Sequence, residues 1–181
     1  YIDAGIIGSV PTSGHRVPVI ASGADAGVFR DTFAPLGMDI TLVGDAVGAA
    51  AGTKLVRSIL AKGLEALYVE ALVVAERSGV TGEVLDTFCA FLDARSARDT
   101  AAILLKSHVV HAARRADEVS LARDLVLEAG VEPIMTDAII RVMRQTAATS
   151  AADRVGQRQP GSLEEALAVL ETELPGSASG A

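Results

Sequence analysis

The feature that most constrains the fold is a long run without proline. From Val47 to Arg77 the chain has no proline, and apolar residues recur every three or four positions. The recurring positions are Leu55, Ile59, Ala66, Val69 and Val73. This spacing is the period of an α-helix. Such a helix would span roughly 45 Å, so we expect it to run along the axis of a domain or of a dimer.

The residues before this run have a different pattern. Residues 1–8, 17–21 and 39–44 have the β-branched, glycine-terminated character of short strands. Between the last two strands, residues 25–36 show apolar residues at helical spacing. Three short strands and one helix make a poor independent domain. We therefore expect residues 1–44 to be the last part of a larger sheet.

The residues after the run predict further helices. We expect helices at about 82–93, 97–116, 117–129 and 133–147, and a last one that begins at Ser162. Ser162 and Glu165 have the spacing of a capping box. The predicted fold class is mainly α: a multi-helical dimerisation domain built on a long central helix, preceded by a short α/β remnant of a Rossmann sheet. The predicted domains are 1–44 (incomplete nucleotide-binding domain), 45–175 (all-helical) and 176–181 (flexible tail).

Composition narrows the class of protein and its partners. Half of the residues are hydrophobic but only 3% are aromatic, which favours closely spaced helices packed through small aliphatic side chains. The single cysteine, Cys89, excludes an intramolecular disulfide framework and a cysteine-based zinc cage, and we expect it to lie in the core. The net charge of −7 argues against a nucleic-acid or membrane partner. We expect a cytoplasmic, bacterial protein. Because the chain begins at Tyr1 without methionine, we expect it to be a piece of a longer protein.

One segment at the start of the long helix could carry chemistry. Gly44 and Gly48 permit a tight strand-to-helix turn, and Lys54 follows one or two turns into the helix. Ser58 and Lys62 lie on the same helix face, at intervals of four residues. A lysine there could donate to, or exchange a proton with, an oxygen of a ligand. The competing interpretation is a helix crossing of small residues with a surface lysine.

A second candidate is the helix that carries His108, His111, Arg114 and Arg115. Two histidines three residues apart could bind a metal, but no third ligand is spaced nearby, so we expect no metal site. These residues form either a polar face with ordinary ion pairs or part of a substrate cleft.

Several segments together resemble a known enzyme family. Residues 2–9 are similar to the D-A-P-V-S-G-G segment of β-hydroxyacid dehydrogenases, and residues 44–58 to their G-x-x-G-x-G-x-x-x-K-x-x-x-N catalytic segment. Glu70-Ala71 and Gly79-Val80 match a further E-A-x-x-L-A-x-x-x-G-V motif. Residues 108–118 and 130–133 resemble the C-terminal domain of uncharacterised function found in some oxidoreductases similar to 6-phosphogluconate dehydrogenase.

The resemblance implies the C-terminal catalytic and dimerisation portion of an oxidoreductase that uses NAD or NADP. Lys54 would be the catalytic acid/base while hydride passes between the nicotinamide and a hydroxyacid-like substrate. The implied substrate-binding residues are Ile7, Gly8, Ser9, Ser58, His111 and Arg115. The implied cofactor-binding residues are Gly48, Ala49 and Ala50. The main nucleotide motif, G-x-G-x-x-G, is absent from the sequence, so this portion alone is expected to be inactive.

Departures from the family pattern bear on the substrate. Gly5 replaces the family's proline, Ile7 its serine, Ser9 its second glycine, and Ser58 its asparagine. Because the family's serine helps to hold a carboxylate, Ile7 favours a bulkier or more apolar substrate than 3-hydroxyisobutyrate. Lys54 argues against imine reductase chemistry, because related imine reductases carry an acid or a tyrosine there. The alternative function is a non-catalytic helical dimerisation module, or an enzyme relic. Either function predicts a homodimer through the helical domain.

Overall fold

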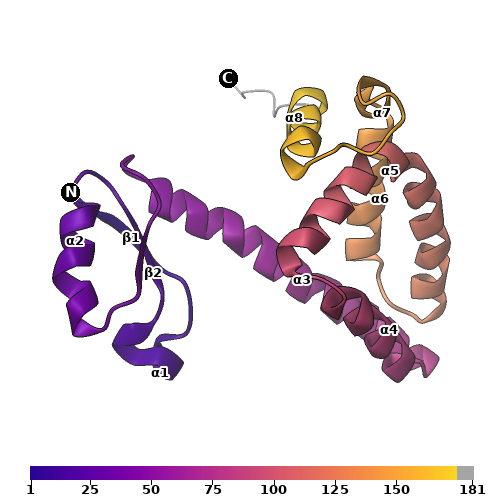
Figure 1. Cartoon of the computed structure of the whole chain (residues 1–181). Helices are drawn as coiled ribbons and strands as arrows, with labels where there is room; N and C mark the ends of the chain where they lie inside the picture. The colour runs from indigo at the N-terminus through magenta and orange to yellow at the C-terminus, as the bar shows by residue number, and fades with distance from the viewer. Residues whose placement is uncertain (175–181) are drawn as a thin grey trace, which may run out of the picture. The chain divides into compact units, whose positions relative to one another are not determined.

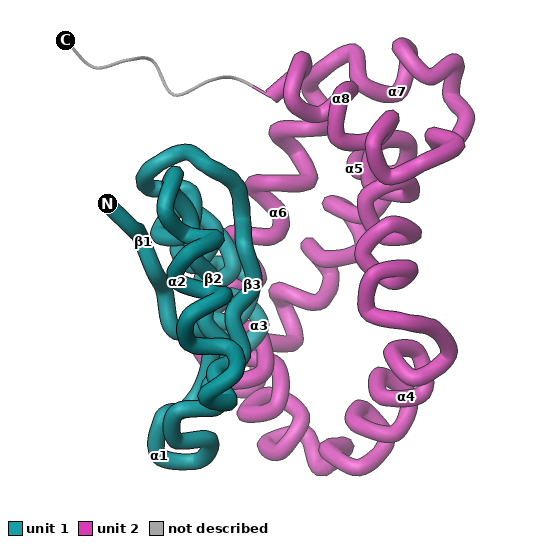
Figure 2. Tube along the Cα trace, turned by 60° about the vertical axis from the view of Figure 1, so that its left-hand side comes forward, with its two compact units in different colours: residues 1–66 teal, residues 67–181 magenta. Residues whose placement is uncertain are grey.

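The computed structural model describes residues 1–174. They form two compact units, one from Tyr1 to Ala66 and one from Leu67 onward (Figure 2). The division falls inside the long helix. The tail expected at residues 176–181 lies outside the described residues. The domain boundary expected at residue 44 stays a prediction.

The first unit contains a small three-stranded sheet (Figure 1). Its strands are β1 (Asp3–Ile6), β2 (Val19–Ser22) and β3 (Ile40–Leu42), in the order β1-β2-β3. β1 pairs with β2 in antiparallel register, and β2 pairs with β3 in parallel register. Helix α2 (Ala26–Phe33) and the 3₁₀ turn η2 (Ala34–Leu36) make the crossover between the parallel strands. The three predicted strands and the predicted helix are therefore confirmed.

The segment between β1 and β2 also contains structure that the sequence analysis did not predict. It forms helix α1 (Val10–Ser13) and the 3₁₀ turn η1 (Gly14–Arg16). Pro11 stands in the first turn of α1, where a missing N–H costs nothing because no intrahelical acceptor would meet it. A four-residue helix is too short to give a periodic pattern, which explains why it was missed.

The predicted long helix is α3 (Ala49–Ser78), a single helix of 30 residues. It ends at Gly79, whose φ of +72° lies in the left-handed region that glycine adopts without steric cost. The N–H of Val80 then donates to the carbonyl of Ala75 at 3.0 Å, which closes the last turn.

The second unit is all-helical after the C-terminal part of α3. It contains α4 (Thr81–Asp93), α5 (Ala97–Glu128), α6 (Ile134–Ala147), α7 (Ala151–Arg154) and α8 (Leu163–Glu173). α5 and α6 lie side by side (Figure 1). A cluster of buried small side chains, Val109, Ala151 and Ala166, joins α5 to α7 and α8. The structure is thus mainly helical with a short sheet segment, as predicted.

Two expectations for this unit are wrong. The helices expected at 97–116 and 117–129 are one helix, α5, because no glycine or proline interrupts residues 97–128. Its N-terminus is capped by Ser96, whose Oγ accepts from the N–H of Asp99 at 3.1 Å. Cys89 was expected in the core and is exposed instead.

The capping box expected at α8 forms in altered form. Ser162 Oγ accepts from the N–H of Glu165 at 3.1 Å. The Glu165 carboxylate accepts from the N–H of Gly161 at 2.7 Å, one residue earlier than the box requires. Within residues 1–174, no helix is both long and apolar enough to cross a membrane.

Candidate functional site

The start of α3 is held by side chains from the sheet of the first unit. Asp3 on β1 accepts from the N–H of Ala51 at 2.9 Å, and Ser22 on β2 accepts from the N–H of Ala50 at 3.0 Å. The Ser22 hydroxyl also donates to the Asp3 carboxylate at 3.4 Å. A carboxylate beside free N–H groups at a helix N-terminus is stabilised by hydrogen bonds and by the helix dipole. The sheet therefore fixes the position of the first turns of α3.

Lys54 lies on those first turns, and its side chain packs on β1. A Cβ atom added to the buried Gly5 would lie 3.3 Å from Cδ and 3.6 Å from Cβ of Lys54. The absence of a side chain at Gly5 thus gives the lysine stem its place against the strand. Within the described residues Lys54 Nζ makes no hydrogen bond or ion pair, whereas Lys62 Nζ, two turns later, pairs with Glu65 at 2.8 Å.

In the glycine-rich turn before Lys54, Gly48 has open space around it, whereas Ala50 is buried by the rest of the unit. Gly48 has a φ of +93° and nothing lies within 4 Å of a Cβ added there. Ala49 is half-buried. Ala50 is fully buried, and its N–H is already donated to Ser22. Of the three residues expected at the cofactor, Gly48 has open space beside it, the N–H of Ala49 donates to the carbonyl of Ala46 at 3.2 Å, and Ala50 is packed into the unit.

The other expected substrate residues of the first unit lie at the end of β1 and on α3. The N–H of Ile7 donates to the carbonyl of Pro18 at 2.7 Å, and its side chain is half-buried. Gly8 and Ser9 are exposed, and Ser9 Oγ accepts from the Thr12 hydroxyl at 3.0 Å. Ser58 is exposed on α3.

In the second unit, the polar face of α5 is organised around Arg115. Its Nη2 donates to the hydroxyl of the buried Ser107 at 2.8 Å. His108 Nε2 lies 2.8 Å from Thr146 Oγ1 on α6. Burial lowers the pKa of His108 below its ordinary value, and the nearby Arg115 charge lowers it further.

Two further residues of this part of α5, His111 and Arg114, differ in their burial and contacts. His111 is half-buried and lies between Ser107 and Arg115 at four-residue intervals on the same face. Arg114 is exposed and forms an ion pair with Glu118 one turn later. The two adjacent arginines therefore have different surroundings, which the sequence alone did not reveal.

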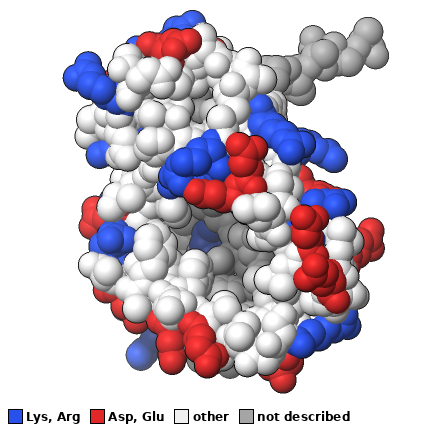
Figure 3. Space-filling model, turned by 90° about the vertical axis from the view of Figure 1, so that its right-hand side faces the viewer, with Lys and Arg blue, Asp and Glu red and all other residues white. Residues whose placement is uncertain are grey.

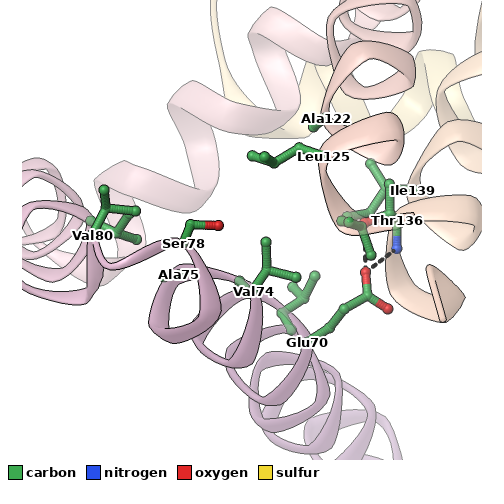
Figure 4. Close-up of a pocket in the computed structure, with 13 residues that line it drawn as sticks. Glu70, Val74, Ala75, Ser78, Val80, Ala122, Leu125, Thr136 and Ile139 are labelled. Carbon is green, nitrogen blue, oxygen red and sulfur yellow. Dashed lines mark hydrogen bonds between the residues drawn. The ribbon is translucent and has the colours of Figure 1, made fainter. Parts of the chain in front are cut away.

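The second unit also contains an apolar cavity, drawn in Figure 4. It has a volume of about 260 Å³ and is lined by side chains of α3, α5 and α6 and by Val80 and Val84 at the start of α4. Its only charged lining residue is Glu70. The Glu70 carboxylate accepts from the N–H of Met135 at 2.7 Å, the N–H of Thr136 at 2.8 Å and the Thr136 hydroxyl at 2.5 Å.

These contacts show what two sequence motifs do. Asp3 of the D-A segment fixes the N-terminus of α3, and Glu70 of the E-A motif fixes the N-terminus of α6. Gly79 of the same motif ends α3. Sequence reasoning did not assign these roles, because a carboxylate that caps a distant helix has no local spacing signal. Among residues 1–174, no three metal-ligating side chains gather.

Among the described residues, the face that Figure 3 shows has no patch of charged side chains of one sign. Lysine and arginine side chains are interspersed there with aspartate and glutamate.

Comparison with known proteins defines the class to which this fold belongs. A reductive aminase from Aspergillus terreus, solved with NADPH and ethyl levulinate, has a TM-score of 0.64 at 17% sequence identity. The match covers 95% of this chain and 60% of the aminase. A conserved protein of unknown function, described as structurally similar to 3-hydroxyacid dehydrogenases, is 33% identical over 86% of this chain and 57% of its own, with a TM-score of 0.48. The chain therefore has the fold of the matched part of this reductive aminase.

Comparison of the amino-acid sequence gives a more specific match for part of the chain. Residues 75–146 match the family described as a domain of unknown function, DUF1932. The uncharacterized 28.5 kDa protein in 7S RNA 5'region of Methanothermus fervidus is 26% identical over 135 residues, which are 75% of this chain and 52% of that protein. Residues 75–146 are thus similar to this domain of unknown function, and the predicted resemblance to the helical C-terminal part of 3-hydroxyacid dehydrogenase-like proteins is confirmed. The chain spans only about half of the curated relative.

Proposed function

We propose that the protein containing this chain transfers hydride between a nicotinamide cofactor and a hydroxyacid-like substrate, with Lys54 as the acid/base. The observation that supports this role is the placement of Lys54. Its stem packs on Gly5, its helix is fixed by Asp3 and Ser22, and no described residue neutralises its ammonium group. A lysine held in this way presents a proton donor at a defined position.

In this proposal the neutral amine of Lys54 accepts the hydroxyl proton of the substrate during oxidation, and the ammonium group so formed returns it during reduction. Ser58, one turn later, hydrogen-bonds the same oxygen. Ile7, Gly8 and Ser9, at the end of β1, hold the rest of the substrate. His111 and Arg115 are the proposed substrate contacts on α5.

The cofactor, NADP or NAD, supplies the hydride acceptor when bound. Gly48 fits a contact with it, because nothing lies within 4 Å of a Cβ added there, and Ala49 is the next residue of the same turn. Ala50 takes part as the buried residue that holds the turn in place. The phosphates of the dinucleotide need a glycine-rich motif that this sequence does not contain.

We further propose that the protein is a cytoplasmic homodimer through its helical domain, with no nucleic-acid or membrane partner. Support comes from α3, where residues 51–62 are exposed at every position although Leu55, Val56, Ile59 and Leu60 are among them. Large apolar side chains exposed along one helix in this way favour a covering surface.

Replacing Lys54 tests the catalytic proposal. In the full-length protein, Lys54→Ala should lower kcat by roughly 10²–10⁴, because the step loses its acid/base. Turnover would be followed by nicotinamide absorbance with a panel of 3-hydroxyacids and both NAD and NADP. The circular dichroism spectrum and Tm of the variant should equal those of the wild type.

Lys62→Ala is the matched control, because Lys62 lies on the same helix face but is paired with Glu65. It should keep wild-type turnover. Near-normal activity of Lys54→Ala would contradict the catalytic role. Failure of the intact protein to bind either cofactor would favour the alternative, a non-catalytic dimerisation module or enzyme relic.

A further inference from the structure

Arg115 carries a charge that no acidic group balances within the described structure. The residue is half-buried, and its one hydrogen bond among residues 1–174 is to the neutral hydroxyl of Ser107 at 2.8 Å. By contrast, Arg114 pairs with Glu118 and Arg123 pairs with Asp137 at 2.6 Å. A partly buried charge without a counter-charge is costly.

The unused donors of this guanidinium are suited to an oxyanion. Arginine has five N–H donors in a planar fork that matches the oxygens of a carboxylate or a phosphate. Only one hydrogen bond from Arg115 is made within residues 1–174. Charge-assisted, bidentate pairing would satisfy further donors and balance the charge together.

Two polar side chains, Ser107 and His108, lie next to this guanidinium. Ser107 Oγ accepts from Arg115, so its own hydroxyl hydrogen is left to donate. Ser107 is only 8% exposed, which fixes its side chain. His108 lies beside Arg115 and contacts Thr146 through Nε2. An anion at this place would raise the pKa of His108, opposing the effect of Arg115.

We propose that Ser107, His108 and Arg115 form a binding site for a small oxyanion, the carboxylate or phosphate group of a ligand. Identifying this group as the anionic end of the substrate or cofactor rests on the proposed dehydrogenase function, whereas the binding itself does not. The site would bind one end of the ligand through charge and leave the reacting centre to other residues.

Titration of the full chain with simple anions tests the site. Inorganic phosphate, acetate and sodium chloride would be added at matched ionic strength while the His108 ring signals are followed by NMR. We expect phosphate or acetate to shift these signals saturably and to raise the His108 pKa, and chloride to do neither. Tighter binding of acetate assigns a carboxylate ligand, and tighter binding of phosphate assigns a phosphate. An equal response to all three salts would overturn the proposal.

Two adjacent variants provide the matched comparison. Arg115→Gln should weaken anion binding roughly tenfold or more, while Arg114→Gln should leave it unchanged. Arg115→Lys keeps the charge and should retain part of the affinity, which covers the case in which Arg115→Gln does not fold. Equal losses in Arg114→Gln and Arg115→Gln would contradict the site. Lys54→Ala should bind the anion normally, so failure of the catalytic proposal and failure of this one are distinguishable.

Discussion

At the scale of single residues, identical side chains in this protein differ by what they contact. Lys54 and Lys62 lie on one helix face, yet only Lys62 has an acidic partner among the described residues. Arg114 and Arg115 are neighbours in sequence, yet only Arg114 has one. Because ionic partners come from three-dimensional placement, the sequence could identify these residues as candidates but could not separate them.

His108 should make the stability of the protein depend on pH. Its pKa is lowered in the folded state, by burial first and by the Arg115 charge second. The unfolded chain then binds a proton more readily, so stability is full above about pH 6.5 and falls as the pH drops toward the lower folded pKa. Urea unfolding at pH 7.5 and at pH 5.5 would measure the difference.

Replacement by a non-titrating side chain isolates this contribution. His108→Gln should reduce the loss of stability between pH 7.5 and 5.5, whereas His15→Gln, in an exposed segment, should leave it as in the wild type. If both variants show the wild-type pH dependence, His108 is not the residue responsible.

At the scale of secondary-structure elements, the N-termini of two helices are capped by carboxylates from other parts of the chain. The Asp3 carboxylate on β1 accepts from the first turn of α3, and the Glu70 carboxylate on α3 accepts from the first turn of α6. Each carboxylate accepts from N–H groups that have no partner within their own helix. These contacts connect elements far apart in sequence and fix the direction in which each helix leaves.

Removal of the Glu70 carboxylate should destabilise the second unit. Glu70→Ala leaves the N–H groups of Met135 and Thr136 and the Thr136 hydroxyl without their acceptor, at an expected cost of about 1–3 kcal/mol. Chemical denaturation would give the free energy of unfolding. Hydrogen exchange at the Thr136 amide should accelerate.

Glu65→Ala is the control, because Glu65 lies on the same helix and only pairs with Lys62 at the surface. It should unfold close to the wild type, since exposed ion pairs contribute little. A Glu70→Ala variant as stable as Glu65→Ala would show that the contact to α6 does not stabilise the unit.

The elements themselves were largely predictable, and the exceptions have physical causes. α3 was predicted because its period is sustained over 30 residues between glycine signals. The prediction of two helices over 97–116 and 117–129 was wrong, because no glycine or proline interrupts α5. The caps provided by Asp3 and Glu70 were not predictable, because each joins residues that are far apart in sequence: the separation is 48 positions for Asp3 and Ala51, and 65 for Glu70 and Met135.

At the scale of the whole molecule, α3 carries more apolar surface than the described chain covers. Leu55, Val56, Ile59 and Leu60 are 62–74% exposed, and no position from 51 to 62 is buried. Monomeric proteins rarely leave contiguous apolar surface of this kind uncovered. This exposure supports the proposed homodimer, in which the same surface of a second chain would meet it.

Charge introduced on α3 should dissociate the proposed dimer. Leu60 is 74% exposed, so Leu60→Glu disturbs little in the single chain but places a charge in the proposed interface. We expect the dimer dissociation constant to rise roughly a hundredfold or more, measured by sedimentation at micromolar concentration.

Leu121→Glu on α5 is the matched control, because Leu121 is equally exposed, at 74%. It should remain dimeric. A wild-type protein that sediments as a monomer would contradict the homodimer, and dissociation by Leu121→Glu but not by Leu60→Glu would place the interface away from α3.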